Sequence, residues 1–112
     1  MAFKTKWYLN NSICELVPIK HGDSRGFLSE TFKLSYLREL NILDQFVQDN
    51  HSLSQEKFTF RGMHFQKPPF DQAKLVRVLK GKILDIFVDL RQNSPTYLQH
   101  GMIEISEEKF NQ

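Results

Sequence analysis

Three side chains able to bind an anion and move a proton lie close together near the middle of the chain, at Arg61, His64 and Lys74. They occupy two short blocks, 60–66 (FRGMHFQ) and 72–76 (QAKLV), whose apolar positions are typical of strands. A histidine titrates near neutral pH, and the two cations would attract an anionic group. A solvated face of a half-buried hairpin explains the same spacing, so these blocks alone leave both interpretations open.

The spacing of the arginine and the histidine raises a geometric question. Residues three apart on a regular strand point to opposite faces. For Arg61 and His64 to reach one pocket, the strand must break its alternation between them, and Gly62 is the residue type that permits a bulge. We therefore predict a bulge or irregular pairing between Gly62 and His64. A regular ladder through 59–66 would leave only one of the two side chains facing the pocket.

The composition is that of one ordinary globular domain covering residues 1–112, with 40% hydrophobic and 25% charged residues. The net charge of +2 comes from 15 basic and 13 acidic residues that form no basic tract, which argues against nucleic acid as a partner. The single cysteine, Cys14, excludes an internal disulfide framework and is expected to be a buried, unreactive thiol. The chain contains no apolar run near 18 residues and no signal-peptide pattern, so we expect no membrane partner and a cytoplasmic location.

The hydrophobic pattern predicts strands along most of the chain and one helix, at 33–43, where leucines recur every three residues. Turn residues separate the strands, and Ser106 is expected to cap a new helical turn. The expected strands are 13–19, 27–32, 46–53, 59–66, 74–80, 82–91 and 102–105, and the expected turns are 8–11, 21–26 and 93–96.

These elements predict an all-β fold, a sandwich or a barrel. The segment 82–91 alternates most regularly: an apolar row that includes Leu84 and Ile86 lies on one face, and Asp85 and Asp89 lie on the other. We interpret the two aspartates as structural or rim carboxylates. The chain ends just as a new element opens, so sheet edges and one apolar face are expected to be uncovered.

The chain contains five ordered blocks that belong together: 23–27 with Glu30, 46–52, 60–66, 72–76, and 88–91 with 94–96. Together these blocks resemble the dTDP-4-dehydrorhamnose 3,5-epimerases of nucleotide-sugar metabolism. The resemblance implies a double-stranded β-helix of the cupin or jelly-roll type with one short N-terminal helix, C-terminally truncated here. It also implies a homodimer, a dTDP-sugar substrate, and no metal or organic cofactor.

The resemblance also implies roles for individual residues. His64 matches the general base that removes protons at C3 and C5, beside the sugar's C4 ketone, and a neutral imidazole suits that task. Lys74 matches a lysine that stabilises the negative oxygen that develops during the reaction. The positions that match substrate-contacting residues of the family are Arg25, Glu30, Gln48, Asp49, Asn50 and Arg61.

The chain departs from the family in one respect. The family's acid tyrosine, an aspartate that pairs with the base and a further histidine all lie downstream of the matching region, and Tyr8, Tyr36 and Tyr97 do not fall at the acid's place. An inactive or nucleotide-sugar-binding remnant of such an epimerase is therefore the alternative. A metal site is not expected, because the four histidines are scattered and form no His-x-His pair.

Overall fold

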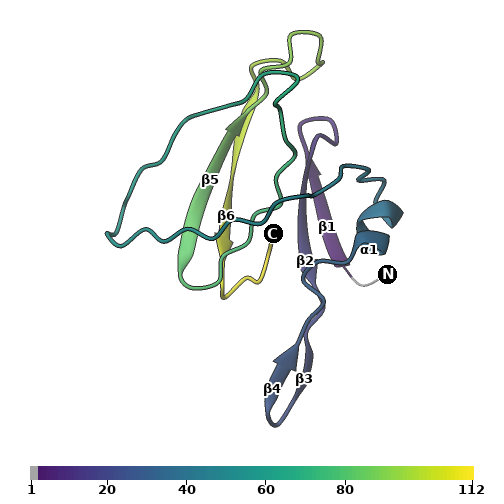
Figure 1. Ribbon diagram of the computed structural model, residues 1–112, viewed down its shortest axis with the longest axis vertical. Coiled ribbons are helices and arrows are strands. Elements are labelled where there is room, and N and C mark those ends of the chain that lie inside the picture. Colours follow the sequence, from purple (N-terminus) through teal and green to yellow (C-terminus); the bar gives the residue numbers. More distant parts are fainter. Residues whose placement is uncertain (1–2) are drawn as a thin grey trace.

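The computed structural model describes residues 3–112, whose regular elements are strands and one short helix. The strands pair as three separate antiparallel hairpins, β1–β2, β3–β4 and β5–β6 (Figure 1). Within the described range, no helix is long and apolar enough to cross a membrane. The elements are β1 (Phe3–Tyr8), β2 (Ile13–Pro18), β3 (His21–Asp23), β4 (Gly26–Leu28), α1 (Leu34–Glu39), β5 (Lys82–Val88) and β6 (His100–Ser106).

The β1–β2 hairpin turns where the sequence predicts a turn, although strand β1 itself is not predicted. Leu9, Asn10 and Asn11 all adopt positive φ, a conformation that asparagine tolerates better than most residues. The amide of Ser12 then donates to the carbonyl of Tyr8 at 3.2 Å and closes the turn. Strand β2 ends at Pro18 as expected, because proline cannot donate to a ladder.

Cys14 lies on β2 and is half-buried. Burial raises the pKa of its thiol, and the neighbouring Glu15 carboxylate raises that pKa further. The thiol therefore stays protonated at neutral pH, which agrees with the predicted unreactive cysteine.

The β3–β4 hairpin projects away from the other two hairpins, at the bottom of Figure 1, and residues 19–29 are called the arm below. Its ladder pairs His21 with Leu28 and Asp23 with Gly26, so only two residues form the turn. The Asp23 carboxylate accepts a hydrogen bond from the amide of Arg25 at 2.8 Å, and Gly26 supplies a positive φ of 130°. The predicted turn at 21–26 is thus the tip of a hairpin, and the strand predicted at 27–32 is shorter.

Helix α1 is shorter than the predicted 33–43. The amide of Asn41 donates to Arg38 and that of Ile42 to Leu37, and Asn41 has a φ of 60°. A left-handed residue just after the last turn is a common way to end a helix. Leu37 is the buried residue of this helix.

The β5–β6 hairpin has the alternation that the sequence predicts. Phe87 lies opposite Gly101, where an added Cβ would come within 2.9 Å of two ring carbons, so a larger residue there would force the ring to shift. The face with Phe87 and Ile105 packs toward the rest of the chain, and Phe87 meets Tyr8 at 6.0 Å between ring centroids. The opposite apolar row is uncovered, since Leu84 is 57% and Ile86 45% exposed.

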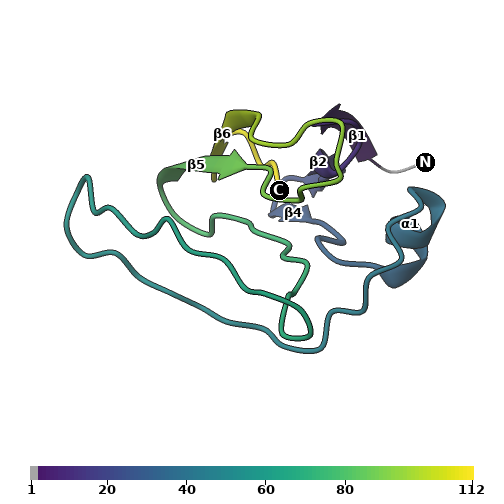
Figure 2. The same ribbon diagram turned by 90° about the horizontal axis from the view of Figure 1, so that it is seen from above.

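The strands predicted at 46–53, 59–66 and 74–80 do not form. No residue between Glu39 and Lys82 lies in a helix or strand, and this segment runs as a separate extended layer beneath the hairpins (Figure 2). Alternating side chains make a segment suitable for a sheet, but a strand also needs a neighbour for its N–H and C=O groups. The described residues do not provide that neighbour.

The fold is open rather than compact. Its radius of gyration of 15.3 Å exceeds the roughly 13 Å of a compact domain of this length. Its accessible surface of 9435 Å² exceeds by roughly 3,000 Å² the value for a compact monomer of this mass. The buried hydrophobic residues are Leu16, Leu37 and Ile105.

A buried carboxylate holds the turn that follows β5. Asp89 is only 6% exposed and accepts hydrogen bonds from the Arg91 guanidinium at 2.9 Å and from the hydroxyls of Ser94 and Thr96, each at 2.6 Å. The bonds from Arg91, Ser94 and Thr96, in that order of effect, hold the pKa of Asp89 far below its usual range. This confirms the turn predicted at 93–96 and supports the structural interpretation of Asp89.

The depressed pKa predicts how stability depends on pH. Because the folded pKa of Asp89 lies below the unfolded value of about 3.9, the carboxylate stabilises the fold above that pH and loses its effect as the pH falls further. We expect Asp89→Asn to lower the melting temperature at pH 7 and to flatten its fall between about pH 4 and pH 2. Thermal melts over this range, compared with those of Asp71→Asn, would contradict the prediction if both variants followed the wild type.

Candidate functional site

Arg61 is held in place by the segment that precedes it. Its Nε donates to the Ser54 hydroxyl at 3.1 Å, and a terminal nitrogen donates to the Leu53 carbonyl at 3.0 Å. A guanidinium has five N–H donors, so others remain for an anion such as a phosphate. These two bonds close the loop 53–61 without any strand pairing.

The backbone next to His64 has a conformation that favours glycine, although it forms no strand. Gly62 has a φ of 107°, a conformation that side-chain-bearing residues rarely adopt. A Cβ added there would lie 3.3 Å from Nδ1 of His64, so glycine also leaves room for the imidazole. The predicted bulge itself is not present, because no ladder forms in which it could lie.

Gln48 and Asn50 lie on one side of the extended segment, as their two-residue spacing predicts. The Gln48 amide donates to the Asn50 side-chain oxygen at 3.0 Å. Asp49 lies between them and is exposed. The pair thus presents amide groups that can hydrogen-bond a polar ligand.

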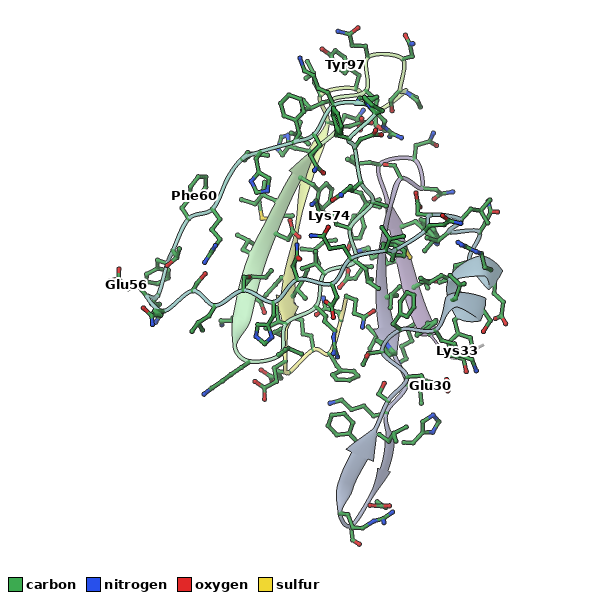
Figure 3. The ribbon with its side chains drawn as sticks, viewed as in Figure 1. Glu30, Lys33, Glu56, Phe60, Lys74 and Tyr97 are labelled. Atoms are coloured by element: carbon green, nitrogen blue, oxygen red, sulfur yellow. The ribbon has the colours of Figure 1, made fainter. Side chains whose placement is uncertain are left out.

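Lys74 and Glu30 lie in different parts of the molecule. Figure 3 places Lys74 on the extended layer near the middle of the molecule, and Glu30 at the base of the arm. Lys74 is exposed. The Glu30 carboxylate forms an ion pair with Lys33 at 3.3 Å and accepts a hydrogen bond from the Tyr36 hydroxyl at 3.4 Å. Glu30 and Lys74 therefore do not meet within a single copy of the chain.

Arg25 lies farther still from this region, at the tip of the arm (Figure 1). Its side chain is 88% exposed and pairs with Asp23 at 2.7 Å. This pairing lowers the pKa of Asp23 and raises that of Arg25, but an exposed ion pair adds little stability. Of the residues predicted to share one site, those on the arm are separated from those on the extended layer.

One carboxylate in the structure has properties that the sequence did not reveal. Asp85 is half-buried on the inward face of β5, two residues from Phe87, and burial raises its pKa. Its alternation with apolar neighbours was the only sequence signal for this position. Between residues 3 and 112, the side chains of His, Cys, Asp and Glu form no group of three or more that could hold a metal ion.

Comparison with known proteins decides the family. A family model described as dTDP-4-dehydrorhamnose 3,5-epimerase matches residues 11–112. The chain belongs to the dTDP-4-dehydrorhamnose 3,5-epimerase family. This epimerase-family chain is 48% identical over 92 residues to the epimerase of that name from Sinorhizobium fredii, covering 81% of the chain and 47% of the relative. It is 41% identical over 96 residues to the Shigella flexneri epimerase, covering 85% of the chain and 52% of the relative.

Solved epimerase structures share the whole described course of the chain. The epimerase from Bacillus anthracis, solved with TDP and PPi bound, is 40% identical with a TM-score of 0.93, covering 98% of this chain and 63% of that one. The Legionella pneumophila epimerase, solved in complex with dTDP-4-keto-L-rhamnose, is 38% identical with a TM-score of 0.88, covering 97% and 57%. The extended layer of this epimerase-family chain therefore follows a course found in solved enzymes. The chain spans about half the length of the curated relatives that it matches.

Proposed function

We propose that this protein acts in deoxysugar biosynthesis as a nucleotide-sugar 3,5-epimerase. It would convert dTDP-4-dehydro-6-deoxy-D-glucose to dTDP-4-dehydro-L-rhamnose. The observation that carries the proposal is the family match through residues 11–112, a range that includes His64 and Lys74. Two of the relatives were solved with a TDP compound bound, which supports a thymidine-diphosphate sugar as the substrate class.

The proposed chemistry is proton transfer beside a ketone. The neutral imidazole of His64 takes the proton from C3 or C5, the C–H bonding pair moves into the ring, and the C4 oxygen becomes an enolate. Lys74 donates to that oxygen and stabilises its charge. Inversion is complete when an acid returns a proton to the opposite face of the same carbon.

The remaining predicted residues would hold the substrate. Arg61 keeps donors free beyond its bonds to the loop 53–54, and a guanidinium fits diphosphate oxygens. The amides of Gln48 and Asn50 would bind polar groups of the nucleotide or sugar, and Asp49 lies beside them. Arg25 and Glu30 would complete the contacts from the arm.

The open fold supports a double-stranded β-helix as the full architecture. The segments 46–53, 59–66 and 74–80 carry strand alternation and follow the backbone of solved epimerases, but they have no strand neighbours among residues 3–112. Additional strands placed against them would satisfy their backbone groups and cover apolar side chains such as Phe60, which is 77% exposed. The uncovered face of β5 would be buried in the same way.

The arm supports a homodimer whose subunits share residues. Arg25 projects away from the layer that carries His64 and Lys74, so a single copy leaves the predicted contacts apart (Figures 1 and 3). In a two-fold dimer, an arm that leaves one copy can reach the site of the other, and the exchange is reciprocal.

Solvent-deuterium exchange tests the proposed chemistry. The dTDP-4-keto sugar would be incubated with the protein in D₂O, and mass and proton spectra would report label at C3 and C5 and any inversion. The proposal expects label at one or both carbons. A protein that binds the substrate, as measured by calorimetry, but catalyses neither exchange nor inversion would instead be a nucleotide-sugar-binding remnant.

A complementation experiment tests the shared site. If His64 and Arg25 of one site come from different subunits, mixing His64→Ala with Arg25→Ala chains creates heterodimers with one intact site. About half of the dimers in a random mixture are heterodimers, and each of these has one intact site out of two. We therefore expect the mixture of two nearly inactive variants to recover about a quarter of the wild-type exchange rate. No recovery after unfolding and refolding the chains together, or a monomer by light scattering, would contradict the shared site.

A further inference from the structure

A cluster at the base of the arm joins it to a distant part of the chain. The Lys20 ammonium lies 4.6 Å from the centre of the Phe27 ring and 4.3 Å from that of Phe110. The two rings meet edge to face with centroids 5.4 Å apart. Lys20 and Phe27 belong to the arm, whereas Phe110 follows β6. Lys20, Phe27 and Phe110 are called the clamp below.

The clamp is anchored at Phe110 by a backbone that is unfavourable for a large side chain. Phe110 has a φ of 57°, a left-handed conformation rare for an aromatic residue. Its amide donates to the carbonyl of Ser106 at 2.9 Å. The next residue, Asn111, is buried and donates to the Glu15 carboxylate at 2.7 Å and to the carbonyl of Glu104. A strained conformation that its surroundings hold in place is a reason to look for a function.

Another contact at the base of the arm lies within the arm itself. Ser29 donates its hydroxyl to the carbonyl of Ile19 at 2.8 Å, which ties the two ends of the arm to each other. That bond does not fix the angle between the arm and the rest of the molecule. The contacts of Lys20 and Phe27 with Phe110 join the arm to a later segment and can fix this angle, because Phe110 follows a paired strand.

We propose that Lys20 and Phe110 are positioning residues that fix the angle of the arm and so place Arg25 for binding the substrate's diphosphate. The placement of Arg25 for the diphosphate rests on the proposed function, whereas the fixing of the arm's angle does not. A cation between two rings favours one arrangement, because both ring faces must meet the same ammonium. Loss of the clamp would leave the arm folded by its own ladder and turn but free to swing about its base.

The angle of the arm can be measured without any activity. Spin labels at Ser24→Cys on the arm and Lys4→Cys on β1, in a Cys14→Ala background diluted with unlabelled chain, report the distance within one copy. We expect Lys20→Met and Phe110→Gly to broaden this distance distribution and Lys20→Arg to keep it narrow. Lys6→Met is the matched control, because Lys6 lies 5.1 Å over the Tyr8 ring outside the arm.

Phe110→Gly separates positioning from stability. Glycine accepts a positive φ, so this variant removes the ring without destabilising the turn, and its melting temperature should equal or exceed that of the wild type. A broader distance distribution at unchanged melting temperature is the signature expected of the clamp. Unchanged distributions in both Lys20→Met and Phe110→Gly would overturn it.

Calorimetric titration with dTDP tests the link to the site. We expect the clamp variants to weaken binding about fivefold and to have no further effect in an Arg25→Ala background, since they act through that residue. If wild type binds, Arg25→Ala weakens binding and the clamp variants bind normally, the positioning role is overturned. If wild type does not bind dTDP, the proposed function fails instead, and the distance measurement still decides whether the clamp fixes the arm.

Discussion

Replacing His64 with alanine is expected to reduce exchange at C3 and C5 of the dTDP-4-keto sugar by about 100- to 10,000-fold, the usual contribution of a general base. The substitution removes the group that takes the proton and leaves Arg61 and its bonds to residues 53–54 in place. Substrate affinity should therefore change much less than the exchange rate. Deuterium incorporation measured beside calorimetric binding separates the two effects.

The control for this variant is His100→Asn. His100 is an exposed histidine that pairs with Val88 at the start of β6 and has no assigned part in the chemistry. It should exchange the substrate as the wild type does. Equal exchange rates in His64→Ala and wild type would show that another group is the base, and Asp85 would be the next carboxylate to test because burial raises its pKa.

Leu16→Ala is expected to lower the free energy of unfolding by about 3 kcal/mol. Leu16 is 2% exposed on β2, and it is one of three buried hydrophobic residues in the described part of the chain. Its backbone exchanges two hydrogen bonds with Gln112, which tie β2 to the last residue of the chain. A core this small has little other packing to compensate for the lost contacts. Urea unfolding followed by circular dichroism measures the change.

Val47→Ala provides the comparison, because Val47 is 86% exposed in the extended layer. Its effect should stay within about 0.5 kcal/mol if that surface is solvated in solution. A loss as large as that of Leu16→Ala would show that a partner or further strands bury Val47. Such a result would support the proposed β-helix and dimer and would change the interpretation of the exposed layer.

The features that the sequence predicted correctly are those that depend on neighbouring residues. The asparagines at 10 and 11 turn the chain by adopting positive φ. Ser106 caps its turn by accepting from the amide of Lys109 at 2.9 Å, and Gln48 and Asn50 share a side because they are two apart. The family could also be predicted from the sequence, since the resemblance depends on five short blocks in a fixed order.

Pairing depends on distant segments, and there the sequence was insufficient. The alternation of 59–66 indicated a strand, yet only a neighbour can convert alternation into a ladder, and residues 3–112 offer none. The alternation of 82–91 indicated two faces of a strand but not which face packs, and in the structure the face with Phe87 packs against the chain while the row of Leu84 and Ile86 is exposed.

The sequence by itself determined the family and the residue types of the candidate site. Only the tertiary structure decided that Arg25 lies on a projecting arm, apart from the layer that carries His64 and Lys74. It also decided that Lys20 meets the ring of Phe110, which lies far away along the chain. The physical reason is that residue type and local spacing set the chemistry a side chain can do. The side chains that meet are set by long-range packing, which no local pattern records.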